Sequence, residues 1–250
     1  MLSKAIIKYI NSLQIKKYRF LHQTFVVEGA KSVRELLASG FEIEKLFVTD
    51  DFLQKYGKQL DKRCAYEVVT EQQLVQAGTY GSNNAALAVA RMKELPPLKL
   101  TGSEMLLALD DVRDPGNLGT IIRIADWYGI KHLICSETCA DFYNPKTIAA
   151  TMGSFARVSA YYVNLPEFLA KQAGRFKVYG ADMHGENIHG MNLKPSGILV
   201  MGNEANGIRP EVREFVTDLV KIPGFGQAES LNVATATAIL VDNFFRQVKQ

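Results

Sequence analysis

Polar side chains gather in three loops of the C-terminal half of this 250-residue chain, each directly after a short apolar run typical of a buried strand. These runs cover residues 105–109, 198–201 and 219–222. Because ligands of parallel α/β sheets bind outside the carboxyl ends of the strands, we expect the three loops to form one site. The loops supply an arginine, a carboxylate, a hydroxyl and two amides: Arg123, Glu204, Ser230, Asn117 and Asn232.

The loops also contain residues that let a backbone turn sharply. Gly202 and Gly207 flank Glu204, and Gly224 and Gly226 lie in the third loop. Glycine tolerates tight turns and lets a ligand approach the backbone closely. Taken alone, the second loop also fits a simple helix cap, and the third fits a tight turn before an ordinary capped helix.

Helical segments are predicted to follow the first and third loops. Residues 118–125 carry an apolar stripe at helical spacing. Arg123 lies off this stripe and shares a face with Thr120 and Trp127, so it is expected to be exposed. Ser230 is predicted to cap the helix that follows the third loop. A solvated helix arginine is the ordinary alternative for Arg123.

These stretches, in this order and spacing, resemble the three signature motifs of the SpoU family of RNA ribose 2′-O-methyltransferases, within the SPOUT class. The motifs correspond to residues 114–123, 202–208 and 222–233. Residues 25–33 resemble the family's L30e-like substrate-binding domain. Two departures are Gly224, where the family often has methionine, and Thr151, where serine is usual. The resemblance implies an α/β fold with a mostly parallel SPOUT sheet and a C-terminal trefoil knot, preceded by a small α/β L30e-like domain.

The resemblance implies methyl transfer from S-adenosylmethionine to a ribose 2′-hydroxyl. Arginine stays protonated in ordinary conditions, so Arg123 fits a clamp for phosphate and developing alkoxide better than a base, although proton abstraction is left open. Asn117, Ser230 and Asn232 would orient the ribose and the arginine, and Glu204 would tie the second loop to them. Cofactor contacts are expected at Met201, Gly202, Ile222, Gly226 and Leu231.

The domain organisation follows from composition and periodicity. Short apolar runs alternate with helical patterns over residues 1–95, which predicts a small α/β domain. The resemblance implies that this domain binds RNA. Prolines and a glycine in residues 96–103 predict a linker. Residues 104–250 are predicted to form a second α/β domain, which the resemblance implies is the methyltransferase domain. A helix with a basic face is predicted over residues 4–20, where Tyr18 and Phe20 either stack on unpaired bases or pack in the core.

Composition excludes several classes of protein. The formal charge of +3 permits an anionic partner without requiring one. The odd count and spacing of Cys64, Cys135 and Cys139 argue against disulfides and a metal site. No apolar run is long enough to span a membrane, so a cytoplasmic protein is expected.

The expected partners are RNA and, by resemblance, a second copy of the chain. Ribosomal RNA is preferred to transfer RNA on the two-domain layout alone. The alternatives are transfer RNA as substrate, a non-catalytic RNA-binding protein that keeps the SPOUT fold, and an enzyme of another class on the same scaffold. The homodimer is expected to use the C-terminal helix, whose apolar stripe is Val233, Thr237, Leu240, Val241, Phe244 and Val248.

Overall fold

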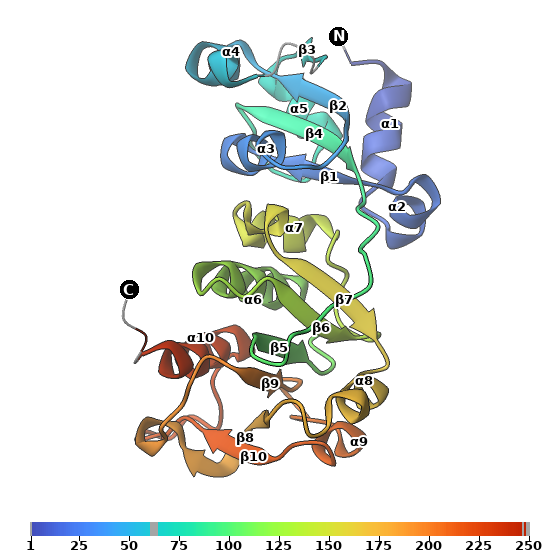
Figure 1. Ribbon diagram of the computed structural model, residues 1–250. Coiled ribbons are helices and arrows are strands. Elements are labelled where there is room, and N and C mark those ends of the chain that lie inside the picture. The colour runs from blue at the N-terminus through green and yellow to red at the C-terminus, as the bar shows by residue number, and fades with distance from the viewer. Residues whose placement is uncertain (1, 61–64, 247, 249–250) are drawn as a thin grey trace. The chain divides into compact units, whose positions relative to one another are not determined.

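The fold was analysed in a computed structural model, which describes residues 2–60, 65–246 and 248 (Figure 1). The chain divides into two compact units: Met1–Glu94 with Asp141–Ala156, and Leu95–Ala140 with Arg157–Gln250. The chain order did not indicate that Asp141–Ala156 would group with N-terminal residues. The domain boundaries inferred from the sequence remain a prediction.

The second unit is built on a six-stranded sheet in the order β10-β8-β9-β5-β6-β7, in which every neighbouring pair is parallel. Its strands are β5 (Met105–Leu109), β6 (His132–Ser136), β7 (Ser159–Val163), β8 (Val178–Asn187), β9 (Gly197–Met201) and β10 (Asp218–Lys221). Its helices are α6 (Pro115–Trp127), η3 (Ile188–Gly190), α8 (Leu165–Gln172), α9 (Pro210–Arg213) and α10 (Val233–Phe245). The predicted α/β class with a mostly parallel sheet is confirmed.

Burial explains why these strands lack an alternating pattern. All five residues of β5 and of β9 are buried, because helices cover both faces of the sheet. Figure 1 shows α6 and α10 over one face and α8 and α9 over the other. Since β5 and β9 are direct neighbours, the first two predicted site loops leave the sheet side by side.

The first unit contains a smaller sheet in the order β1-β4-β2-β3, with β2 and β3 parallel and the other pairs antiparallel. Its strands are β1 (Thr24–Glu28), β2 (Ile43–Val48), β3 (Glu67–Val68) and β4 (Ala86–Arg91). Its helices are α1 (Lys4–Ser12), α2 (Lys16–His22), α3 (Ala30–Leu37), α4 (Asp50–Tyr56), η1 (Gly57–Gln59), α5 (Glu71–Ala77), α7 (Pro145–Thr151) and η2 (Ser154–Ala156). The predicted small α/β architecture is present.

The single helix predicted over residues 4–20 is wrong, because two helices occupy this stretch. Helix α1 ends where Leu13 turns into the core with no exposed surface, and α2 starts at Lys16. Arg19, expected on the basic face, is 1% exposed. Its guanidinium donates to Asp141 and to the carbonyl groups of Leu13 and Gln14. A charge can be buried in this way because it is paired and hydrogen-bonded.

Segment Asp141–Ala156 joins the first unit through aromatic side chains. The ring centroid of Phe25 lies 4.6 Å from that of Tyr143 and 6.1 Å from that of Phe155. Phe41 packs on both Phe25 and Phe155. Aromatic burial of this kind, with the Arg19–Asp141 pair, explains why the segment belongs to this core.

Cys135 and Cys139 are buried free thiols, and Cys64 lies outside the described residues. Within the described ranges, no group of three His, Cys, Asp or Glu side chains is arranged to hold a metal ion. The same ranges contain no helix with the length and hydropathy needed to cross a membrane.

Candidate active site

The first site loop positions Asn117 at the start of α6. Asp114 caps this helix, its Oδ1 accepting a hydrogen bond from the backbone N–H of Asn117 at 2.8 Å, and Pro115 occupies the first turn. The apolar stripe over residues 118–125 is buried, as predicted. The cap and the core together hold the first turn of α6, and with it Asn117, in one place.

A chain of side-chain hydrogen bonds links the three loops. Asn232 Nδ2 donates to Asn117 Oδ1 at 2.9 Å, and Asn117 Nδ2 donates to Glu204 Oε1 at 2.5 Å. Asn232 Oδ1 accepts from the backbone N–H groups of Ala234 and Thr235, which leaves only its Nδ2 for Asn117. The start of α10 therefore sets the orientation of both amides. We call Glu204, Asn117 and Asn232 the amide relay.

The other two predicted catalytic residues stand apart from the relay. Arg123 is exposed on the same face of α6 as Thr120 and Trp127, as predicted, and Trp127 is 84% exposed. In the described part of the chain Arg123 forms no hydrogen bond or ion pair, so its guanidinium is available to a ligand. Ser230 is also exposed and does not cap α10. That prediction is wrong, because Asn232 makes the cap hydrogen bonds.

The predicted cofactor residues differ in what surrounds them. Met201 is buried at the end of β9, and its carbonyl accepts from the N–H of Asp110 at 2.8 Å. At Gly202 an added Cβ would lie 2.2 Å from the carbonyl carbon of Gly207, so only glycine fits where this loop closes on itself. Close backbone contacts within the loop therefore fix the conformation of residues 202–208.

The third loop is more open. Nothing lies within 4 Å of a Cβ placed on Gly226, and Leu231 is exposed, while Ile222 is half-buried. Residues 223–231 form no hydrogen bond with any other described residue, so their backbone groups are free to bind a ligand. Apolar side chains at Ile222 and Leu231, beside free backbone donors and acceptors, fit a cofactor with an apolar ring and polar edges.

A second polar network supports these loops, and sequence reasoning missed it. Asp110 is fully buried and accepts from Arg209 Nε at 2.8 Å and from Arg209 Nη2 at 2.7 Å. Asn203 Nδ2 donates to the backbone carbonyl of Asp111 at 2.9 Å. The sequence signal that could have indicated this network is the pair of acidic residues directly after a buried strand, together with an arginine far along the chain.

Asp111 holds a backbone conformation that is rare outside glycine, with φ of +62°. Its N–H donates to Ser136 Oγ, and its carboxylate accepts from Arg113 Nε at 2.8 Å. Burial by itself would raise the pKa of Asp111, but hydrogen bonds from Arg113 and Thr138 outweigh burial and hold the pKa below its ordinary value. The carboxylate is thus charged where the first loop turns.

Replacing Arg209 by alanine is expected to lower the free energy of unfolding by about 3–5 kcal/mol, because the buried Asp110 carboxylate would lose its partner. Urea unfolding followed by circular dichroism measures this change. Arg213→Ala is the matched control, since the Arg213–Asp182 pair is more exposed and its loss is expected to cost at most about 1 kcal/mol. Equal losses in the two variants would contradict the prediction.

Residues 104–242 match the SpoU rRNA Methylase family, and residues 4–82 match the MRM3-like substrate binding domain. The chain is 33% identical to a 23S rRNA (guanosine(2553)-2′-O)-methyltransferase of Bacillus subtilis, over 94% of each chain. It is 35% identical to the structure of a putative RNA methyltransferase of the TrmH family from Porphyromonas gingivalis, with a TM-score of 0.86 over 99% of this chain and 100% of that one.

An rRNA methyltransferase from Sinorhizobium meliloti, solved with bound S-adenosylmethionine, is 29% identical, with a TM-score of 0.87 over 100% of this chain and 97% of that one. The TM-scores of 0.86 and 0.87 show that this chain shares its fold with solved RNA methyltransferases. This chain belongs to the SpoU rRNA Methylase family. The predicted family and the predicted enzyme class are confirmed.

Proposed function

We propose that the substrate is a nucleotide of ribosomal RNA, in the large subunit, and that the amide relay with Arg123 forms the centre that methylates it. The Bacillus subtilis relative, named for 23S rRNA, supports this choice because the similarity spans both domains. The observation that carries the assignment of the site is the hydrogen-bonded joining of all three loops by Asn232, Asn117 and Glu204.

The reaction class follows from family membership. The enzyme is an S-adenosylmethionine-dependent RNA ribose 2′-O-methyltransferase, as the sequence predicted. The cofactor supplies an activated methyl group on a sulfonium, which leaves as a neutral thioether. The protein therefore has to align the ribose hydroxyl and deal with its proton and the charge that develops on its oxygen.

Arg123 is the proposed clamp for that charge. It is exposed, unpaired within the described residues and permanently protonated, so it can contact a phosphate and the developing alkoxide. Asn117 and Asn232 would orient the ribose and the arginine, with Ser230 joining them from the exposed third loop. Glu204 would hold the second loop against the first through its hydrogen bond with Asn117.

The cofactor is proposed to lie between the second and third loops. Met201, Gly202, Ile222, Gly226 and Leu231 would contact it, mainly through apolar surface and the free backbone groups of residues 223–231. The expected trefoil knot belongs to this proposal. The path of the chain supports the knot. After the edge strand β10 the chain returns to α6, the helix that follows the central strand β5, and there Asn232 donates a hydrogen bond to Asn117.

We also propose a homodimer, but through another face of α10 than the sequence suggested. Most of the predicted apolar stripe, from Val233 to Phe244, is buried inside the unit where α10 packs on α6, and only Val248 is exposed. The open side of the helix borders a groove of about 580 Å³. Its lining residues are His189, Ala238, Ile239, Asp242, Asn243 and Arg246.

Asn243 lines the groove, and its Oδ1 has no hydrogen-bond partner among the described residues. Light scattering is expected to give twice the chain mass of 27.8 kDa, and Ile239→Arg is expected to give the single-chain mass. A single-chain mass for the wild type would refute the homodimer.

Each of the three predicted segments of the chain has its own proposed role. Residues 1–95 would bind RNA, residues 96–103 would link the domains, and residues 104–250 would carry the chemistry without a metal. We place the enzyme in the cytoplasm, as expected from the sequence. A non-catalytic RNA-binding protein is the alternative, and the intact relay and free Arg123 weigh against it.

The test compares unmodified 23S rRNA, 16S rRNA and total transfer RNA as acceptors of labelled methyl from S-adenosylmethionine. Nuclease digestion then identifies the labelled nucleotide. We expect a single ribose-methylated nucleotide from 23S rRNA. Label in transfer RNA alone would replace the substrate, and RNA binding without transfer would support the non-catalytic alternative.

A further inference from the structure

The excess positive charge of the protein lies in its first 27 residues. These residues include four lysines, one arginine and no acidic residue, while the whole chain has a formal net charge of only +3. The rest of the chain therefore carries a net negative charge of −2. Because Arg19 is neutralised by Asp141, the free charges of the segment are lysines on α1 and α2: Lys4, Lys8, Lys16 and Lys17, all exposed.

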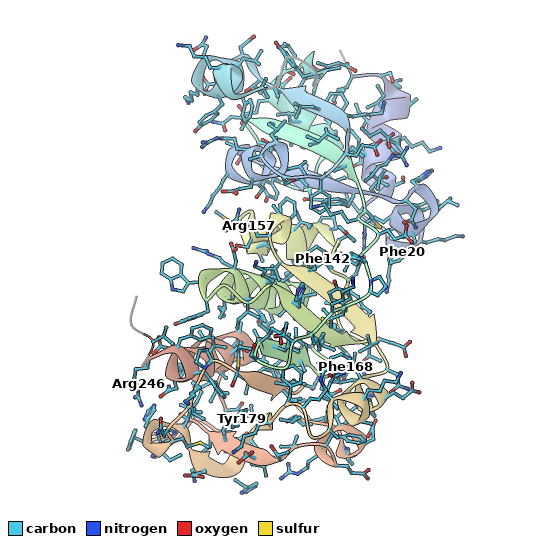
Figure 2. All side chains as sticks on the ribbon, in the orientation of Figure 1. Phe20, Phe142, Arg157, Phe168, Tyr179 and Arg246 are labelled. Atoms are coloured by element: carbon cyan, nitrogen blue, oxygen red, sulfur yellow. The ribbon has the colours of Figure 1, made fainter. Side chains whose placement is uncertain are left out.

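Helix α2 adds exposed apolar side chains to this charge. Phe20 is 49% exposed and Leu21 is 67% exposed, and Ile15, just before the helix, is 55% exposed. Lys17, Phe20 and Leu21 lie at i, i+3 and i+4 and so share one face. Figure 2 labels Phe20 on this helix. Tyr18 is also exposed, so of the two alternatives for these rings, packing in the core is wrong.

Phe20 already engages a cation. The Lys16 Nζ lies 5.6 Å from the centroid of the Phe20 ring, which places a positive charge next to an aromatic face. An aromatic surface beside lysines is suited to a nucleotide, whose base stacks on the ring and whose phosphate pairs with the ammonium group. A purely apolar partner would leave these lysines without counter-charges.

The short helix is held rigidly from its inner side. Arg19 Nη1 donates to the carbonyl groups of Leu13 and Gln14, both at 2.8 Å, and Nη2 donates to Asp141 at 2.6 Å. Gln23 ends the helix in the left-handed conformation, with its Nε2 donating to the Phe20 carbonyl at 2.8 Å. A surface fixed in this way loses little conformational entropy when it binds.

We propose that the exposed face of α2, formed by Lys16, Lys17, Phe20 and Leu21, is a stacking site for an unpaired nucleotide of the RNA substrate. The proposal rests on the proposed function and specifies which surface of the N-terminal domain binds and which RNA feature it selects. Unpaired nucleotides are the class selected because a base inside a duplex has no free face for Phe20.

The test measures binding of fluorescein-labelled single-stranded RNA and of unmodified 23S rRNA by fluorescence anisotropy. We expect Phe20→Ala to weaken binding about 5- to 100-fold and Phe20→Trp to retain it. Tyr66→Ala is the matched control, since Tyr66 is an aromatic residue of the same unit with 44% exposure. It is expected to bind like the wild type.

Salt dependence tests the lysines separately. Lys16→Gln and Lys17→Gln are each expected to reduce the slope of log Kd against log salt by about 0.7, as the loss of one phosphate contact requires. Lys58→Gln, which changes another exposed lysine of the unit, is expected to leave the slope unchanged. A role in stability alone would not alter this slope.

The outcomes separate this inference from the proposed function. Wild-type affinity and salt slope in the Phe20→Ala, Lys16→Gln and Lys17→Gln variants would overturn the inference, even if methyl transfer is intact. If the wild type binds RNA through Phe20 but transfers no methyl group, the proposed function fails while the stacking site stands. For an active enzyme, Phe20→Ala is expected to raise KM for RNA and leave kcat unchanged.

Discussion

Arg123→Ala is expected to lower kcat for methyl transfer by about 10²–10³-fold, because the alkoxide that forms on the ribose oxygen would lose its charged donor. Arg123 is exposed and makes no hydrogen bond within the described residues, so its removal leaves no buried group unpaired. The measurement is transfer of labelled methyl to 23S rRNA under saturating conditions. Circular dichroism and cofactor binding by calorimetry are expected to match the wild type.

The control for this variant is Thr120→Ala, which alters the same exposed face of α6 and removes one hydrogen bond to the Gly116 carbonyl. It is expected to keep most of the activity. Arg123→Lys is expected to recover only part of the lost rate, because an ammonium group cannot make the two parallel hydrogen bonds of a guanidinium. Full activity in Arg123→Ala would remove the arginine from the chemistry.

Asn117→Asp is expected to lower kcat by about 10²-fold, because the hydrogen bond from Asn117 to Glu204 in the amide relay would become a repulsion between two carboxylates. The new carboxylate would face Glu204 where the amide now donates at 2.5 Å, and two like charges at this distance repel. One of the two carboxyl groups would then hold a proton to a higher pH than usual. The defect is therefore expected to shrink as the pH falls and one shared proton restores the hydrogen bond.

The pH dependence of kcat separates this explanation from general damage. The ratio of wild-type to variant activity is expected to decrease between about pH 8 and pH 5, the direction set by protonation of the carboxyl pair. Asn232→Ser is the companion variant. Serine keeps a good helix cap for α10, but its shorter side chain has no second polar group to extend to Asn117 while the hydroxyl caps the helix. Activity is therefore expected to fall while stability stays near that of the wild type. A ratio that does not change with pH would contradict the relay.

The sequence by itself determined the order of the elements, the parallel sheet and the family. Local patterns were sufficient for this, since a fully apolar run such as β5 requires burial on both faces, and loop residues such as Asn117 and Glu204 follow the strands directly. The exposed face of α6 was also predictable, because helical periodicity alone separates Arg123 from the buried stripe.

Only the tertiary structure decided which surfaces meet. The apolar stripe of α10 was visible in the sequence, but its partner is α6 of the same chain, which leaves the opposite face of α10 open. Arg19 was expected in solvent, and Asp141, 122 positions away, allows it to be buried. The same holds for Asp110 with Arg209, and for Asn232, which caps α10 in place of Ser230. Periodicity determines that a side chain is suited to burial or exposure, whereas its partner depends on contacts between residues far apart in the chain.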